Sequence, residues 1–416
     1  MTDRERRGWI IVGAICVTMF FIWGAINSSA VFFVPVLKYF GWTRAKLSTA
    51  LSIGWVTGGA AGPVIGWLAD RVNPKKMMIV GATITGILWV LLSRATSFGE
   101  FFSVNALFGI CVGASTTIPC SLIIASWFER QRGLAIGIAF AAAPIGGAGI
   151  TPIVNHIIVS EGWRAGYLAL GLPIVFIVVP MIYFIVRPAN ASDGGSSSAP
   201  ASEGHAPAPV ELPGFELGQA ARTRSFWLIS GIQLLVGGTL GMGAHYVAYL
   251  TGVGYSPHFA AQVLSMYLLM TTVGALLGGP FADRSGARTA MTATCILAAI
   301  GCVGLLNVAH GLGLAVNIIA GGFALGALGV QMPLVIIESL GVKRFGSLMG
   351  VTGVFYTIGA AISPIATGRI FDVTGSYAIA IIAFIVMLST SAVALLGTRS
   401  LASEEAQFTA STSAAA

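Results

Sequence analysis

Twelve long apolar runs dominate the sequence, and each is long enough to cross a lipid bilayer as a single helix. A helix rises about 1.5 Å per residue, so about 20 apolar residues span the hydrocarbon core. Helices and closed barrels satisfy their own backbone in lipid, and these runs are too long and too continuously apolar for barrel strands. The predicted spans are residues 9–37, 47–69, 77–95, 101–125, 134–158, 165–186, 226–252, 259–282, 289–309, 312–336, 346–368 and 376–398.

Composition supports lipid as the solvent and argues against several other classes of protein. Of the 416 residues, 56% are hydrophobic and 9% are charged, whereas soluble domains carry about 25% charged residues. All five cysteines fall inside apolar runs, which argues against a disulfide framework and a metal site. Basic residues are dispersed over short loops, so nucleic acid is not an expected partner. We expect a monomer in the bilayer that needs no cofactor.

The distribution of basic residues predicts the orientation in the membrane. With the N-terminus inside, six of the 22 Lys and Arg residues face outward and the remaining sixteen face the cytoplasm. The six are Lys38, Arg44, Lys46, Arg94, Arg164 and Arg369. Because cytoplasmic loops are enriched in Lys and Arg, we predict a multi-pass protein of a bacterial-type inner (plasma) membrane, with both termini in the cytoplasm.

The two halves of the chain repeat each other at one constant offset. Residues 66–71, Gly-Trp-Leu-Ala-Asp-Arg, reappear as residues 279–284, Gly-Pro-Phe-Ala-Asp-Arg, and the same shift of 213 residues takes Gly133 to Gly346. One offset that holds at loops and spans alike indicates an internal duplication. We therefore predict an all-α membrane protein with two pseudo-symmetric six-helix bundles.

The predicted domain boundaries follow from this duplication. The bundles comprise residues 1–187 and 225–400. Residues 188–224 are the predicted cytoplasmic linker, which is rich in Ser, Ala, Pro and Gly and ends in a short interfacial helix. Residues 401–416 are a polar tail that we expect to be disordered.

The repeated motif resembles the signature loop of the major facilitator superfamily, which lies between spans two and three and again between spans eight and nine. The resemblance implies the major facilitator fold and secondary transport. Glycines let helices approach closely, and the aspartates stand at helix ends beside arginines, where charge pairs can hold the cytoplasmic side closed and then release it. The alternative is that these are surface charges that set topology. The residues assigned to this gate are Gly66, Asp70, Arg71, Gly279, Asp283, Arg284 and Arg132.

Other stretches are similar to the bacterial branch related to monocarboxylate transporters and oxalate–formate exchangers. They are residues 40–48, 127–137, 162–164 and 226–227. This resemblance implies transport of a small monocarboxylate, often with a proton or by exchange. Those relatives commonly carry a cation in span eight and some carry one in span eleven, where this chain has Ala275 and Thr352. Because an anion in a low-dielectric cavity needs a partner, a neutral or weakly polar solute, or drug export, stays an alternative.

Polar and aromatic side chains inside the spans are the candidates for solute binding, because transporters with repeated halves bind solute near the midplane between the repeats. For the glutamines, hydrogen bonds between helices are an equal alternative, since a polar group in lipid needs a partner. The candidates are Asn27, Ser28, Thr116, Gln233, His245, Tyr249, Tyr267, Gln331 and Tyr356.

His245 is the most informative of these residues. It is an ionisable side chain well within a span, and Tyr249 lies one helical turn further on. An imidazole titrates near neutrality, so it could bind an anion when protonated or couple proton movement to transport. A neutral histidine held by a neighbouring hydroxyl or carbonyl group is the alternative.

The leading functional hypothesis is a secondary transporter of a small organic acid that works by alternating access, with proton coupling or exchange. A rival from another class is a membrane sensor that binds solute without moving it. An enzyme is not expected, because the histidines are scattered and no nucleophile stands with a base. An ATP-driven pump is not expected either, because the sequence has no phosphate-binding loop.

Overall fold

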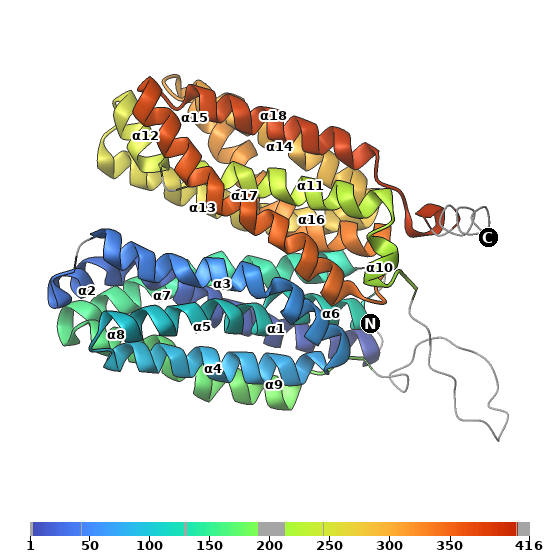
Figure 1. Cartoon of the computed structure of the whole chain (residues 1–416), viewed down its shortest axis with the longest axis horizontal. Helices are drawn as coiled ribbons and strands as arrows, with labels where there is room; N and C mark the ends of the chain where they lie inside the picture. The colour runs from blue at the N-terminus through green and yellow to red at the C-terminus, as the bar shows by residue number, and fades with distance from the viewer. Residues whose placement is uncertain are drawn as a thin grey trace.

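The computed structural model describes residues 3–42, 44–128, 131–189, 213–243, 245–404 and 406. Within them, 12 helical stretches are long and apolar enough to cross a membrane, which confirms the predicted twelve-span all-α fold. Because the number of described spans is even, the start of the first span at Asp3 and the end of the last span at Leu396 lie at the same end of the bundle, on the right in Figure 1. This end is here termed the termini side, and the opposite end the far side.

Each half contains six spans, some of which are divided into consecutive segments. The first half consists of α1 (Asp3–Asn27), η1 (Ser28–Phe32), α2 (Phe33–Phe40), α3 (Arg44–Arg71), α4 (Pro74–Arg94), α5 (Phe98–Ser115), α6 (Thr117–Trp127), α7 (Arg132–Glu161), α8 (Trp163–Pro173), η2 (Ile174–Val178) and α9 (Val179–Ile185). The second half consists of α10 (Leu217–Ala220), α11 (Arg224–Gly238), η4 (Thr239–Met242), α12 (Tyr246–Val253), α13 (Pro257–Ser285), α14 (Ala287–Leu306), α15 (Gly311–Val316), η5 (Asn317–Gly321), α16 (Gly322–Leu340), α17 (Phe345–Thr374) and α18 (Ala378–Leu396).

The two halves are built alike and lie side by side (Figure 1). In the first half α1 packs on α7, α3 on α5 and α4 on α8; in the second half α11 packs on α17, α13 on α16 and α14 on α18. The second set of pairs is the counterpart of the first after the 213-residue shift. The halves meet along two helix pairs, α3 with α17 and α7 with α13.

Glycines bring these two helix pairs into backbone contact near the termini side. A Cβ atom at Gly66 would collide with the carbonyl group of Gly346, and one at Gly133 would collide with that of Gly279. Small residues let membrane helices approach closely enough to gain packing energy. The repeated glycines therefore form the contact surfaces between the halves.

Several spans are interrupted. Spans one and seven pass through 3-10 segments, η1 and η4, at places related by the 213-residue shift. Span four breaks at Thr116, whose φ of −120° and ψ of −107° separate α5 from α6. The π-helical segments η2 and η5 interrupt spans six and ten. Membrane helices tolerate such breaks where neighbouring groups satisfy the freed backbone.

Two segments differ from the sequence-based prediction. The interfacial helix expected near residues 215–224 is the single turn α10, because the chain turns after Ala220 to begin α11 behind the Thr223 cap. Residues 401–404 form a helical turn in which Glu404 is buried, where we predicted a disordered tail. Residues 190–212 of the predicted linker and 407–416 of the predicted tail lie outside the described residues.

Candidate functional site

Asp70, at the end of α3, joins the two halves by binding the first turn of α17. Its two carboxylate oxygens accept hydrogen bonds from the N–H groups of Gly346 and Ser347, each 2.8 Å long. Arg344, the N-cap residue of α17, makes no side-chain cap. The first N–H groups of a helix have no partner within the helix and carry partial positive charge. A carboxylate of the first half therefore caps a helix of the second half.

The duplicate aspartate makes the equivalent contact in the opposite direction. Asp283, at the end of α13, accepts hydrogen bonds from the N–H groups of Gly133 at 2.8 Å and Leu134 at 2.9 Å. These groups belong to the first turn of α7, whose N-cap residue Gln131 makes no side-chain cap. The four hydrogen bonds of Asp70 and Asp283 are here termed the latch.

The partners that the structure gives the latch aspartates are backbone N–H groups, where the sequence suggested charge pairs with arginines. Arg71 lies with its guanidinium carbon 4.3 Å from the ring centroid of Trp67. Arg132 donates from Nε to the carbonyl oxygen of Phe128 at 2.7 Å, and Arg284 is exposed. A helix N-terminus offers several aligned donors without a counter-charge, which explains why it can replace an arginine.

The end of the linker is attached next to the latch. Glu216 accepts a hydrogen bond from Nε of Arg344 at 2.7 Å, and the backbone of residues 213–215 pairs with that of residues 340–342. The Arg344 guanidinium holds the pKa of the Glu216 carboxyl below its usual range. The same contact, with a smaller electrostatic contribution from Asp70, raises the pKa of Arg344. Arg344 therefore interacts with two carboxylates: it donates a hydrogen bond to Glu216 and is attracted more weakly to Asp70 of the first half.

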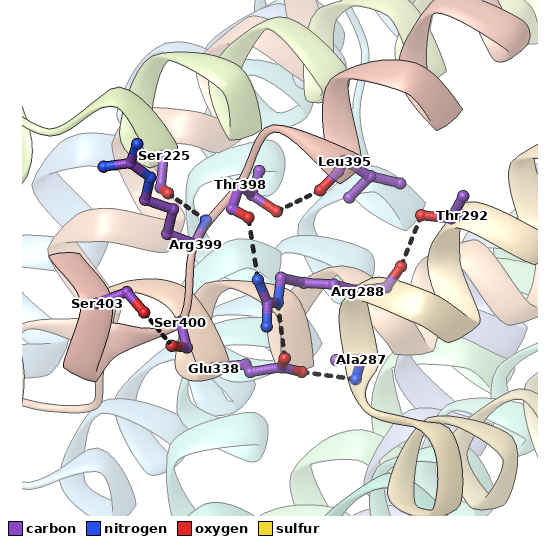
Figure 2. A network of polar contacts seen from close by, with 10 residues as sticks. All are labelled: Ser225, Ala287, Arg288, Thr292, Glu338, Leu395, Thr398, Arg399, Ser400 and Ser403. Carbon is purple, nitrogen blue, oxygen red and sulfur yellow. Dashed lines mark hydrogen bonds and ion pairs between the residues drawn. The ribbon is translucent and has the colours of Figure 1, made fainter.

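A second polar network ties the C-terminal segment to the second half (Figure 2). Glu338, at the end of α16, accepts hydrogen bonds from Nε of Arg288 at 2.8 Å and from the first backbone N–H of α14 at 2.6 Å. Arg288 also donates to the carbonyl oxygen of Thr398 at 3.0 Å. Close by, the Ser225 hydroxyl donates to Glu404 at 2.5 Å. Glu338 and Glu404 thus hold three helix ends and the start of the tail together.

The predicted solute-binding residues of the first half lie in three different environments. Asn27 is exposed and donates from Nδ2 to the carbonyl oxygen of Ala143 at 3.4 Å. Ser28 is buried, with its hydroxyl 2.9 Å from that of Thr151. Thr116 is buried and donates to a carbonyl of its own helix. Of the three, only Asn27 presents an accessible side chain in this conformation.

His245 stands at the start of α12, beside α17 and α18. Its Nε2 lies 3.2 Å from the carbonyl oxygen of Pro364, and its Nδ1 lies 3.3 Å from the hydroxyl of Tyr377. Tyr249 packs edge-on against Tyr377 and donates its hydroxyl to the carbonyl oxygen of Leu305 at 2.9 Å. The imidazole is half-buried, and each of its nitrogens lies near a polar partner. The carbonyl oxygen of Pro364 can only accept a hydrogen bond, whereas the Tyr377 hydroxyl can also donate one.

The two glutamines make contacts between helices of the second half. Gln233 donates from Nε2 to the hydroxyl of Thr352 at 3.4 Å, and Gln331 donates to the carbonyl oxygen of Gly278 at 3.2 Å. Both glutamines are buried. This geometry corresponds to the helix-packing alternative for both residues, although the Oε1 atom of Gln331 has no partner among the described residues.

Tyr267 lies in a cluster with Tyr246 and Asn317, a residue that the sequence did not single out. Tyr267 packs against Tyr246, and the Tyr246 hydroxyl donates to Oδ1 of Asn317 at 2.5 Å. Asn317 lies in the π-helical segment η5 and donates to the carbonyl oxygen of Gly301 at 3.0 Å. Tyr356 is half-buried on α17. An asparagine inside an apolar run is the signal that could have pointed to this cluster.

An aromatic pair between α1 and α3 was also not predicted as part of a site. Trp23 and Trp55 have ring centroids 6.3 Å apart, and 65% of the surface of Trp55 is exposed. Tryptophans were assigned to the apolar spans, and nothing in their local sequence distinguishes a ring facing lipid from one facing the other half.

Comparison with known proteins gives the same architecture. A family model described as the Major Facilitator Superfamily matches residues 14–261 and 226–414. The chain is 25% identical over 375 residues to monocarboxylate transporter 13 of Bos taurus, covering 89% of this chain and 84% of that protein. It is also 25% identical over 391 residues to the uncharacterized MFS-type transporter YcxA of Bacillus subtilis, covering 88% and 89%.

Two solved structures share the fold. The transporter FucP in its outward conformation superimposes with a TM-score of 0.70 at 16% identity, covering 94% of this chain and 98% of that one. The proton:xylose symporter XylE, bound to 6-bromo-6-deoxy-D-glucose, superimposes with a TM-score of 0.74 at 13% identity, covering 97% and 100%.

Proposed function

Because the chain belongs to the Major Facilitator Superfamily and is a multi-pass membrane transporter, we propose that it carries a small organic acid of the monocarboxylate type by alternating access. The observation that carries the mechanism is the latch, in which Asp70 and Asp283 cap helices of the opposite half. The latch closes the space between the halves at the termini side, and its release opens that side.

Alternating access needs contacts that are specific but break at low cost. When Asp70 leaves α17, both the carboxylate and the helix N-terminus can be hydrated, so no buried charge is left without a partner. The glycine contacts beside the latch are between backbones, so they add no interlocked side chains that would have to disengage when the halves separate. Residues 1–187 and 225–400 would therefore rock against each other as two units, with the site between them facing each side in turn.

Two features support an organic acid as the solute. The chain is similar over 89% of its length to a monocarboxylate transporter, and His245 offers a half-buried imidazole beside α17, one of the helices that meet the first half. Asn27 supplies an amide donor from the first half. A protonated His245 would bind a carboxylate and release its proton with it, which gives proton-coupled symport; binding the anion alone gives exchange.

A neutral or weakly polar solute, including export of a drug, is the second candidate. Position 275 in span eight is an alanine whose carbonyl oxygen packs against Gly137, and position 352 in span eleven is a buried threonine. Neither position supplies a cation for an anionic solute. This candidate keeps the same alternating mechanism and changes only the chemistry of the site.

The distribution of basic residues supports an inner (plasma) membrane location with both termini in the cytoplasm. Arg71, Lys75, Lys76, Arg284 and Arg288 all lie on the termini side, at the ends of α3 and α13 or the starts of α4 and α14. The termini side would then be the cytoplasmic side, and the latch a cytoplasmic latch. We propose a monomer as the working unit, because each of its two halves supplies one latch aspartate to the other.

Uptake into proteoliposomes tests the proposed solute. Purified protein is reconstituted, and uptake of labelled lactate, pyruvate, formate and oxalate is measured with and without an imposed proton gradient. Saturable uptake of at least one of these acids is expected, and a proton gradient accelerates it if transport is coupled. If no acid enters while a neutral compound does, the acid assignment is wrong and the transporter assignment stands.

A further inference from the structure

Trp55 lies on the face of α3 that meets the second half. Gly66, Gly62 and Gly59 mark this face, and Cβ atoms at these positions would all meet α17. Trp55 continues the same row, because residues 55, 59, 62 and 66 are spaced by four, three and four and share one face of a helix. The row that is covered by α17 near the termini side therefore ends, toward the far side, in an uncovered tryptophan.

The depth of Trp55 distinguishes it from a membrane-belt residue. It lies 11 residues from the start of α3 and 16 from its end, or about 16 Å and about 24 Å along the helix. Tryptophans that anchor helices sit at the membrane–water interfaces. Trp67 fits that description, since it stands one turn from the end of α3 under the guanidinium of Arg71. Trp55 is too deep for this role.

The matching row of α17 leads to His245. Gly346, Gly350 and Thr357 touch α3, and Pro364 and Gly368 continue their row at helical spacing. The His245 ring lies on this continuation, bonded to the Pro364 carbonyl, and a Cβ atom at Gly368 would lie 3.5 Å from its Cε1 atom. Past their contacts near the termini side, the facing rows of α3 and α17 thus present Trp55 on one side and His245 on the other.

We propose that Trp55, supported by Trp23, binds the apolar part of the solute, and that the solute is an organic acid carrying an aromatic ring or another flat, unsaturated group. This inference rests on the proposed transport of an organic acid. A tryptophan ring offers a large apolar surface and prefers offset stacking or edge-on contact with another π-system. A flat ring packed on Trp55 would direct its carboxylate across the space toward the imidazole of His245.

The test compares three probes that separate the ring from the charge: phenylacetate, acetate and phenylacetamide. Binding to the purified full-length protein is measured by titration calorimetry for the wild type and for Trp55→Ala and Trp55→Phe. We expect phenylacetate to bind at least ten-fold more tightly than acetate, Trp55→Ala to remove about ten-fold of phenylacetate affinity, and acetate binding to change less than two-fold. Trp55→Phe should keep most of the affinity for phenylacetate.

Trp67→Ala is the matched control, since Trp67 is a tryptophan of the same helix that is 47% exposed and lies off the row. Its substitution should change neither affinity. If phenylacetate binds no more tightly than acetate, or if Trp55→Ala weakens both equally, the aromatic assignment is overturned while acid transport stands. If neither acid binds but phenylacetamide binds in a Trp55-dependent way, the acid proposal fails and the aromatic surface is upheld.

Discussion

The carboxylate of Asp70 accepts a hydrogen bond from the backbone N–H of Gly346 at 2.8 Å, although 276 positions of sequence separate the two residues. One belongs to the last turn of α3 and the other to the first turn of α17. This contact joins the halves through a carboxylate and a helix N-terminus. Both groups can be hydrated by water when the halves separate. It is a contact suited to repeated breaking.

Replacement of Asp70 by Asn should open the termini side. An asparagine can still accept hydrogen bonds but lacks the charge that a helix N-terminus stabilises by up to about 1 kcal/mol, so the closed population should fall about five-fold relative to the open one. Spin labels at Lys76→Cys and Thr289→Cys, which are exposed and related by the repeat, would report the distance between the halves. The five native cysteines are replaced in this background.

The equivalent substitution Asp283→Asn should act in the same direction, and the double variant should open further than either one. Substitution of Glu404 by Gln is the control, because this carboxylate binds Ser225 and so makes its contact within the second half. An unchanged distance distribution in Asp70→Asn would show that the carboxylate charge does not hold the halves together.

Gly66→Ala should block closure of the termini side. The added methyl group would collide with the carbonyl group of Gly346, which is backbone and cannot rotate away. We expect at least a ten-fold loss of transport with a shift toward the open distance, while the fold of each half persists. Gly13→Ala is the control, since no other helix of the described residues comes within 4 Å of the new methyl group. Normal transport by Gly66→Ala would mean that the halves do not need to approach this closely.

Glu216→Gln should strengthen the latch. Arg344 is bound to Glu216 and lies near Asp70, so loss of the Glu216 charge leaves the guanidinium free to favour Asp70. The closed population should therefore increase, and the double variant with Arg344→Gln should behave like Arg344→Gln alone. Additive effects of the two substitutions would show that Glu216 does not act through Arg344.

The Glu216 contact should not respond to pH near neutrality. Arg344 lowers the pKa of Glu216 in the folded protein. The stabilisation that the ionised contact provides is therefore complete above the ordinary glutamate pKa, near 4.3, and is lost as the pH falls through the lowered pKa. Between pH 5 and pH 8 the labelled distances of wild type and Glu216→Gln should therefore differ by a constant amount. A difference that varies within this range would assign another titrating group to the contact.

His245→Gln should remove the pH dependence of transport if the imidazole couples proton movement. The amide keeps hydrogen-bonding capacity but does not titrate, so uptake should persist at a lower rate without acceleration by a proton gradient. Tyr377→Phe keeps the imidazole and removes the hydroxyl near Nδ1; acceleration of uptake by a proton gradient should persist in this variant. Unchanged uptake and pH dependence in His245→Gln would remove this residue from the mechanism.

The span count and the doubled architecture were predictable from sequence, because hydrocarbon thickness fixes helix length and the repeated residues 66–71 and 279–284 keep one offset. The partner of Asp70 was not predictable in the same way. A backbone N–H group carries no sequence signal, so residue types alone suggested an arginine instead of the first turn of α17. The break at Thr116, by contrast, has a sequence signal that was missed: Pro119 lacks an N–H group, and in a continuous helix its ring would clash with the carbonyl group of Ser115.

The candidate solute site was harder to predict than the fold. Polarity within a span selected Asn27, which is exposed, and Gln331, which is fully buried, because a polar side chain can serve either solute binding or helix packing. Trp55 was missed for the opposite reason. An apolar ring in an apolar span becomes notable only when the row of Gly59, Gly62 and Gly66 shows which face meets the other half.

Counterflow in proteoliposomes tests the central claim most directly. Vesicles loaded with an unlabelled acid that the protein binds are diluted into the same acid carrying a label. Alternating access predicts a transient accumulation of label above its equilibrium level by the wild type, and none by Gly66→Ala. A wild-type protein that binds the acid but shows no such accumulation would contradict transport through a site between the two halves.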